Sequence, residues 1–233
     1  MQIIEYLKNP TVRNHNQFSQ LEKIKKTLSI FLLYVAIALI AGIFLRIIDS
    51  LIFYFSDFSI YEQLKVTNSE SINRFGNYSF IIVVILGPLY EEILFRLPLN
   101  LSKLSIGVSL GFMFFYLLTG NLLSIDYQKF DTYFKIVGSI FFAGLVTFFF
   151  PKKFLDLFKN NFKLVFFIHA VIFALLHLTN FDSYNSSVIL IYPLFTLPQL
   201  IMAVLIGYTR IEIGFAYCVL LHSLINLLSF AVN

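Results

Sequence analysis

The sequence has few charged residues and a single cysteine. Charged residues make up 13% of the 233 positions, against about 25% in soluble domains. The one cysteine, Cys218, lies in an apolar run, which excludes an intrachain disulfide framework and a cysteine-based zinc site. The chain also has neither an internal repeat nor a low-complexity linker. With 58% hydrophobic residues and a mean hydropathy of +0.82, the composition indicates an integral membrane protein.

Long apolar runs predict an all-α, polytopic transmembrane bundle of about seven spanning helices. A chain of 233 residues has room for about seven helices of about 20 residues each, and so no separate soluble domain is expected. Polar stretches at 56–77, 121–133 and 151–163 read as loops, and the first can carry a surface helix. The expected spans are Ser29–Phe55, Tyr78–Leu97, Leu104–Leu123, Phe134–Phe150, Leu164–Asn180, Val188–Tyr208 and Ile213–Val232.

The distribution of basic residues predicts the orientation. Residues 1–28 form a basic segment expected on the cytoplasmic side, and residues 29–233 form the membrane-embedded domain. A net charge of +4 in a membrane chain marks cytoplasmic loops, so no nucleic-acid partner is expected. With the N-terminus inside, the inner segments carry Lys8, Arg13, Lys23, Lys25, Lys26, Arg96, Lys103, Lys152, Lys153, Lys159, Lys163 and Arg210, and the outer segments carry Lys65, Arg74 and Lys129.

Three ionisable residues lie close together inside the second expected span. Glu91, Glu92 and Arg96 occur in the run 87–96, and ionisable groups within a membrane span are expensive and mark functional sites. Residues four apart share a helix face, so Glu92 is expected to pair with Arg96. Glu91 lies about 100° around the helix without a cation nearby, which suits a general base. The alternative is a structural Glu–Arg clamp between helices.

Histidines occur in two further spans. His169 and His177 lie in the fifth span, and His222 lies in the seventh, where it shares a face with Asn226. Each alone is more often an interhelical hydrogen-bonding group than a catalyst. At 1.5 Å per residue, Glu91, His177, His222 and Asn226 all lie roughly 10–20 Å from the cytoplasmic ends of their spans, so they can meet. His169 lies about a dozen ångströms nearer the cytoplasm and ranks second.

This set of residues suits hydrolysis of a peptide bond by activated water. Glu91 can remove a proton from a water assisted by neutral His177, while His222 and Asn226 offer donors to the oxyanion. No Gly-x-Ser-x-Gly elbow supports a serine mechanism, and Asp49 is the only convincing membrane aspartate. Zinc held by Glu91, His177 and His222 is possible chemically, but without a His-Glu-x-x-His helix the pattern does not require a metal.

Three short patterns in these spans resemble the motifs of the CPBP intramembrane protease family, also called the CAAX-protease and bacteriocin-processing or Abi family. Glu-Glu-x-x-x-Arg matches Glu91, Glu92 and Arg96; Phe-x-x-x-His matches Phe173 and His177; His-x-x-x-Asn matches His222 and Asn226. The resemblance implies an all-helical membrane fold in which Glu91 and His177 activate water and His222 and Asn226 form the oxyanion site. Glu92, Arg96 and Phe173 would support them.

The resemblance also implies a substrate class, a peptide or protein at the membrane. A bacterial member would cut leader or signalling peptides or give self-immunity to a bacteriocin. A eukaryotic member would remove the last three residues of a prenylated CAAX protein. The separation of Glu91 from His177 is long for the family, and segments around 112–116 and 134–150 look like an added helical pair. The Phe-, Ile-, Asn- and Lys-rich composition hints at an AT-rich bacterial genome, so a bacterial plasma membrane is the expected location.

The competing class is a non-enzymatic membrane protein, such as an immunity factor, a scaffold or a small transporter, that keeps the polar cluster for packing or ion passage. A transporter would favour discontinuous helices and a repeat, and the chain has kinking prolines but no repeat.

Other polar residues within the expected spans have ordinary structural explanations. Arg46 and Asp49 are expected to pair or to snorkel, and Pro193, Pro198 and Gln199 predict a kink that is either structural or shapes a cavity.

Overall fold

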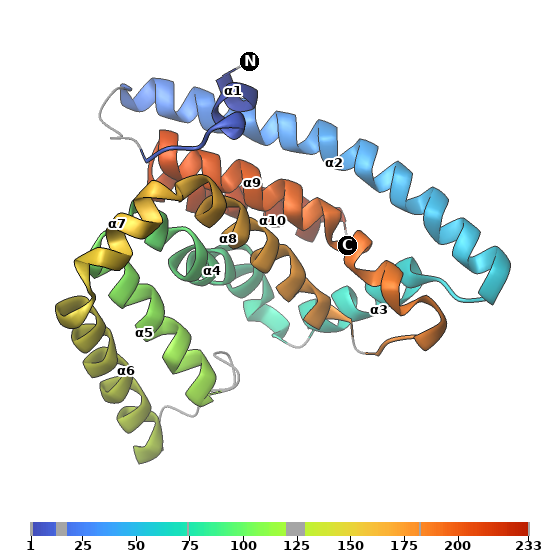
Figure 1. Ribbon diagram of the computed structural model, residues 1–233. Coiled ribbons are helices and arrows are strands. Elements are labelled where there is room, and N and C mark those ends of the chain that lie inside the picture. Colours follow the sequence, from blue (N-terminus) through green and yellow to red (C-terminus); the bar gives the residue numbers. More distant parts are fainter. Residues whose placement is uncertain (1, 13–17, 74, 120–128, 182, 233) are drawn as a thin grey trace.

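The protein is a bundle of helices. A computed structural model describes residues 2–12, 18–73, 75–119, 129–181 and 183–232, and within them every regular element is a helix (Figure 1). This confirms the predicted all-α class. The α-helices are α1 (Gln2–Lys8), α2 (Gln20–Ser56), α3 (Ile60–Asn73), α4 (Gly87–Phe95), α5 (Lys103–Thr119), α6 (Phe130–Phe149), α7 (Lys152–Asn160), α8 (Phe162–Leu176), α9 (Leu197–Glu212) and α10 (Phe215–Val232). Shorter turns are η1 (Gly76–Tyr78), the π-helical η2 (Ile81–Leu86), η3 (Leu97–Asn100), η5 (His177–Asn180) and η6 (Ser186–Thr196).

The helices have the inverted polarity of a membrane protein. Large apolar side chains face outward, with Phe55 81% exposed and Leu190 91% exposed, whereas Glu92 and Arg96 are buried. Only a lipid surround makes such exposure favourable, and intramembrane charges face the bundle interior. The chain is therefore an integral membrane protein. Six segments of the described chain are long and apolar enough to span: Gln20–Ser56, Gly76–Phe95, Phe130–Phe149, Phe162–Asn180, Ser186–Glu212 and Phe215–Val232.

The remaining expected span, Leu104–Leu123, corresponds to α5. This apolar helix has 17 residues, slightly short of a full crossing, and positions 120–123 lie outside the described residues. The orientation of the bundle stays a prediction.

The first span begins earlier than hydropathy predicts. Ser19 caps α2 in a capping box with Glu22, so the helix starts at Gln20, and the expected boundary after residue 28 falls inside a continuous helix. At 37 residues, α2 is about 55 Å long and exceeds the roughly 30 Å hydrocarbon core. Tyr6 of α1 is buried and packs edge-on against the rings of Phe166 and Tyr208. The basic N-terminal segment thus docks on α8 and α9.

The helices α5 and α6 form a hairpin that extends away from the other helices in Figure 1. They pack through small residues, as helices in lipid commonly do. A Cβ atom at Gly111 would lie 2.6 Å from Cβ of Ala143, and one at Gly107 would lie 2.0 Å from Oγ1 of Thr147. The two glycines therefore let the backbones approach closely, and this pair corresponds to the added helical pair expected from the sequence.

Two polar stretches expected to be loops contain helices. α3 fits the expectation of a surface helix in 56–77. The stretch 151–163, expected to be a loop, instead forms α7, which starts after Pro151 and carries exposed Lys152, Lys153 and Lys159 and a buried Leu155. Such a basic amphipathic helix suits the membrane surface.

Asp49 and Arg46 were expected to pair with each other or to snorkel, and the structure gives them separate partners instead of the pair. The Asp49 carboxylate accepts hydrogen bonds from the Ile60 amide at 2.8 Å and the Tyr61 amide at 3.2 Å, and so caps the start of α3. The Arg46 guanidinium stacks on the ring of Tyr61 at 3.8 Å. Asp49 therefore fixes α3 against α2.

The helices α4, α8, α9 and α10 surround the buried polar residues. Gly207 of α9 faces the ring of Phe166 on α8, and a Cβ atom there would come within 2.9 Å of that ring. This glycine lets α8 and α9 approach each other closely at this point. The motif residues of three separate spans consequently meet inside this group of helices.

Candidate active site

A π-helical turn precedes the two glutamates. Residues 81–86 are wound as η2, and the amide of Gly87 donates to the carbonyl of Ile82, five residues earlier. The π turn leaves carbonyls to be satisfied from outside, and Asn226 on α10 donates from Nδ2 to the carbonyl of Val83 at 2.9 Å. Pro88 then starts α4. Asn226 thus joins α10 to the turn that positions Glu91 and Glu92.

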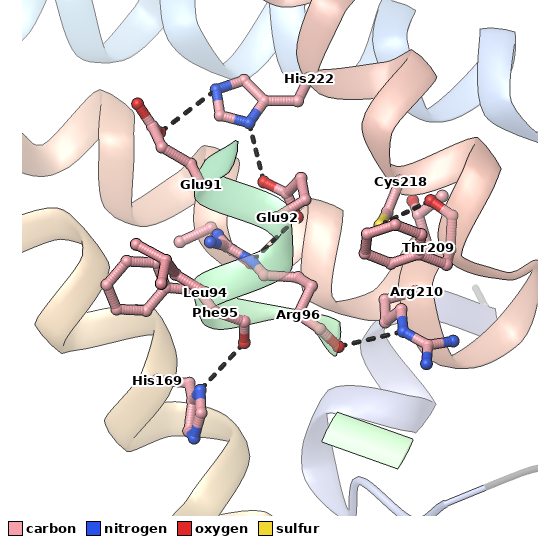
Figure 2. A network of polar contacts seen from close by, with 12 residues as sticks. Glu91, Glu92, Leu94, Phe95, Arg96, His169, Thr209, Arg210, Cys218 and His222 are labelled. Carbon is pink, nitrogen blue, oxygen red and sulfur yellow. Dashed lines mark hydrogen bonds and ion pairs between the residues drawn. The ribbon is translucent and has the colours of Figure 1, made fainter. Parts of the chain in front are cut away.

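Glu92 lies at the centre of a buried network (Figure 2). Its Oε2 lies 3.5 Å from Nε of Arg96, and its Oε1 lies 2.7 Å from Nδ1 of His222. All three side chains are buried. The predicted pairing of Glu92 with Arg96 is confirmed, and the contact with His222 links the first motif to the third.

Glu91 faces the other side of the same imidazole. Its Oε2 lies 3.7 Å from Nε2 of His222, too far for a hydrogen bond. The side chain is 35% exposed, yet Oε2 itself is buried and has no hydrogen-bond partner. A buried acceptor without a partner suits a water or a substrate group between the two residues. The structure therefore brings Glu91 and His222 together, as the sequence predicts.

His177 joins the group through Phe173. The two rings lie 4.7 Å apart, and His177 Nδ1 lies 2.9 Å from the carbonyl oxygen of Phe173. Phe173 is buried, and its ring also packs against His222 at 6.0 Å. Phe173 therefore spaces the two histidines, which explains a phenylalanine in the second motif.

The partners of the two histidines determine which nitrogen carries a proton. A carbonyl oxygen and a carboxylate only accept, so the proton of neutral His177 lies on Nδ1, and the Glu92 carboxylate likewise places the proton of neutral His222 on Nδ1. The Nε2 atom of each neutral ring is consequently an acceptor. His222 can donate to an oxyanion only after its ring takes a second proton, which refines its expected role.

Arg96 ties the site to α8 and α9. Its guanidinium stacks on the ring of Phe173 at 4.0 Å, and Nη2 contacts the carbonyl of Ala203 at 3.5 Å. Its backbone carbonyl accepts from Nε of Arg210 at 3.0 Å. The expected supporting role of Arg96 is therefore structural as well as electrostatic.

Sequence reasoning missed Arg210 and placed Arg96 with the loop charges. Hydropathy ends the sixth span at Tyr208 and so assigns Arg210 to a loop, whereas α9 continues to Glu212 and buries it. Neither arginine is therefore a loop residue, as the charge count had assumed. With both arginines left out of the count, the inner segments still carry many more lysine and arginine residues than the outer segments.

His169 lies outside the cluster of Glu91, His177 and His222. Its Nδ1 lies 2.9 Å from the carbonyl oxygen of Phe95 at the end of α4 (Figure 2). His169 therefore makes the interhelical hydrogen bond that is the usual role of a single intramembrane histidine.

Gln199, which the sequence predicts to lie at a kink, has a buried Oε1 without a hydrogen-bond partner.

The geometry of the donors bears on the zinc possibility. Across the residues that the structure describes, no three histidine, cysteine, aspartate or glutamate side chains form a metal-binding group. Glu91 and His222 present two adjacent donors, and His222 Nδ1 has the carboxylate partner typical of a metal ligand. Among the described residues, His177 is not grouped with these two donors into a three-ligand set.

Comparisons with family models, curated proteins and solved structures found no significant match.

Proposed function

We propose that this protein is an intramembrane endopeptidase that hydrolyses a peptide bond with water activated by Glu91 and His177. The observation that carries the proposal is the pairing of both glutamates with His222, with one glutamate bonded to Nδ1 and the other facing Nε2. A purely structural cluster would need only the Glu92–Arg96–His222 part. Glu91 adds a partly exposed carboxylate with a buried, unpaired oxygen, and that oxygen is a suitable base.

The reaction proceeds by attack of the water oxygen on the scissile carbonyl carbon. Glu91 takes the proton of the water, and His177 Nε2 accepts a hydrogen bond from the same water. Glu91 can pass that proton to Nε2 of His222, and the resulting imidazolium lies between two carboxylates and donates to the oxyanion. The carboxamide of Asn226 has two hydrogens, of which the bond to Val83 uses one. Collapse of the tetrahedral intermediate breaks the C–N bond, and the proton returns to the leaving amine.

The substrate is a peptide or protein segment at the membrane. A bacterial enzyme of this kind would act on leader or signalling peptides in the plasma membrane, with the N-terminus of the enzyme in the cytoplasm. The three motifs matching the CPBP family and the meeting of their residues in one site support this proposal.

The test is cleavage of a quenched peptide library by purified protein in nanodiscs. Wild type is compared with Glu91→Gln and His177→Ala, and Glu62→Gln on α3 is the matched control outside the site. Loss of a general base is expected to lower turnover at least 100-fold, because such groups contribute about 10²–10⁴-fold. Glu62→Gln should retain full turnover, and the effect of a chelator on wild-type turnover decides whether a metal is required. Undiminished turnover in Glu91→Gln would contradict the proposal.

One observation favours the non-enzymatic alternative of an immunity factor, scaffold or small transporter. Asn226 and Glu92 both make contacts that join helices, Asn226 with Val83 and Glu92 with His222, which packing alone would explain. In that case, folded wild type would be inert on prenylated and unprenylated peptides alike, and Glu91→Gln would have no effect on biological function.

A further inference from the structure

A groove runs along α2 on its side toward α10 and α3. Its volume is about 670 Å³, within the range of ligand sites in proteins. It extends along α2 from Tyr34 to Ser50, and Ile225 and Leu228 of α10 form part of the opposite wall. Sixteen residue steps correspond to about 24 Å, longer than the roughly 15 Å that one leaflet contributes to the hydrocarbon core. The groove can therefore take an extended acyl chain.

A cation lies at one end of this apolar groove. Arg46 is exposed and, within the described part of the chain, has no carboxylate partner, since Asp49 caps α3 instead. Its guanidinium stacks on Tyr61 at 3.8 Å and is thereby held in the groove. A charged side chain in a membrane helix normally faces a partner of opposite charge. No such partner lines the groove itself, so the charge of Arg46 is available to an anionic ligand.

The position of Arg46 matches the level of lipid headgroups. Tyr61 belongs to α3, a polar helix outside the candidate spans, so this end of the groove lies at the membrane surface. The Tyr61 hydroxyl has no hydrogen-bond partner among the described residues and can donate to a bound anion. Burial raises the pKa of Tyr61 above its ordinary value, so the hydroxyl keeps its proton. A phosphate here would meet both a guanidinium and a hydroxyl.

We propose that the groove between α2, α3 and α10 binds one anionic phospholipid, with its phosphate at Arg46 and Tyr61 and an acyl chain running along α2 from Arg46 toward Tyr34. The charge of Arg46 selects an anionic headgroup, and the apolar walls take the chain. The site is separate from the Glu91–His222 site and does not depend on the protein being a protease.

Native mass spectrometry of the purified protein, titrated with phosphatidylglycerol or phosphatidylcholine, tests the site. Wild type is expected to bind one phosphatidylglycerol about fivefold more tightly than phosphatidylcholine, equivalent to about 1 kcal/mol for one cation near a lipid anion. Arg46→Gln should abolish this preference. Gly42→Leu should weaken both lipids at least fivefold, because a Cβ atom at Gly42 meets only Tyr61 Oη, at 4.0 Å, and the added side chain occupies the groove without a backbone clash.

Matched controls separate the groove from the general surface. Gly138→Leu makes the same substitution on α6, where a Cβ atom meets nothing within 4 Å, and Lys153→Gln removes an exposed cation on α7. Both should bind lipid like wild type, and circular dichroism should show unchanged helicity for all four variants. Equal binding of the two lipids to wild type, or an unchanged preference in Arg46→Gln, would overturn the proposal. A dimer that dissociates in Gly42→Leu would assign the groove to a second copy and would also overturn it.

Discussion

At the scale of single residues, the two adjacent glutamates have different surroundings. Glu92 is buried between Arg96 and His222, whereas Glu91 is partly exposed and has only a 3.7 Å approach to His222. Adjacent positions on a helix point about 100° apart, so one peptide step separates an internal ion pair from a group that can meet a ligand. Glu92 therefore orients His222, and Glu91 is available for chemistry.

This difference predicts that the same substitution destabilises the protein much more at Glu92 than at Glu91. Glu92→Gln removes the charge that offsets buried Arg96 and is expected to lower the free energy of unfolding by about 3 kcal/mol. Glu91→Gln should lower it by less than about 1 kcal/mol, because its carboxylate has no close pair. Reaction of a fluorogenic maleimide with Cys218, the only cysteine and fully buried, reports unfolding in detergent. Equal destabilisation by the two substitutions would show that Glu91 is also a structural residue.

At the scale of elements, small residues and one irregular turn decide how the helices fit. The π-helical turn before α4 is held by Asn226, and the glycines of α5 allow close packing with α6. Hydropathy identifies the turn at 81–86 and the helix α5 as apolar, but it does not distinguish a π turn from an α-helix. The packing partner of each helix is decided by these local details.

The α5–α6 hairpin provides a direct test of close packing. Gly111→Leu is expected to destabilise the pair by about 1–3 kcal/mol, because the new side chain overlaps Ala143. Faster hydrogen exchange of the backbone amides in α5 should reveal this locally. Gly138→Leu on α6 is the control, since no atom lies within 4 Å of a Cβ there. If Gly111→Leu left the exchange of α5 unchanged, the proposed close contact would be refuted.

At the scale of the whole molecule, charge bias predicts a cytoplasmic N-terminus. The basic helix α7 and the N-terminal lysines belong on the inner face, and Lys65 of α3 on the outer face. In intact cells, Lys65→Cys should react with a membrane-impermeant maleimide, while Lys153→Cys should react only after the cells are opened. Background labelling is low because Cys218 is buried. The reverse pattern would invert the topology.

The sequence by itself determined the class of the protein and most of its spans. Apolar runs of about 20 residues define membrane helices because backbone groups in lipid must be satisfied within the helix. The four-residue spacing of Glu92 and Arg96 correctly predicted their ion pair, because residues four apart lie on the same face of a helix. Local periodicity is enough for contacts within one helix.

Only the tertiary structure decided which residues of different helices meet. His222 bonds to Glu92, Asn226 to a carbonyl released by the π turn, and Asp49 to α3 instead of to Arg46. Arg210 lies inside α9 although hydropathy ends the span before it. These contacts depend on the rotation and depth of each helix relative to its neighbours. Both are set by packing between side chains far apart in the chain, which no local pattern records.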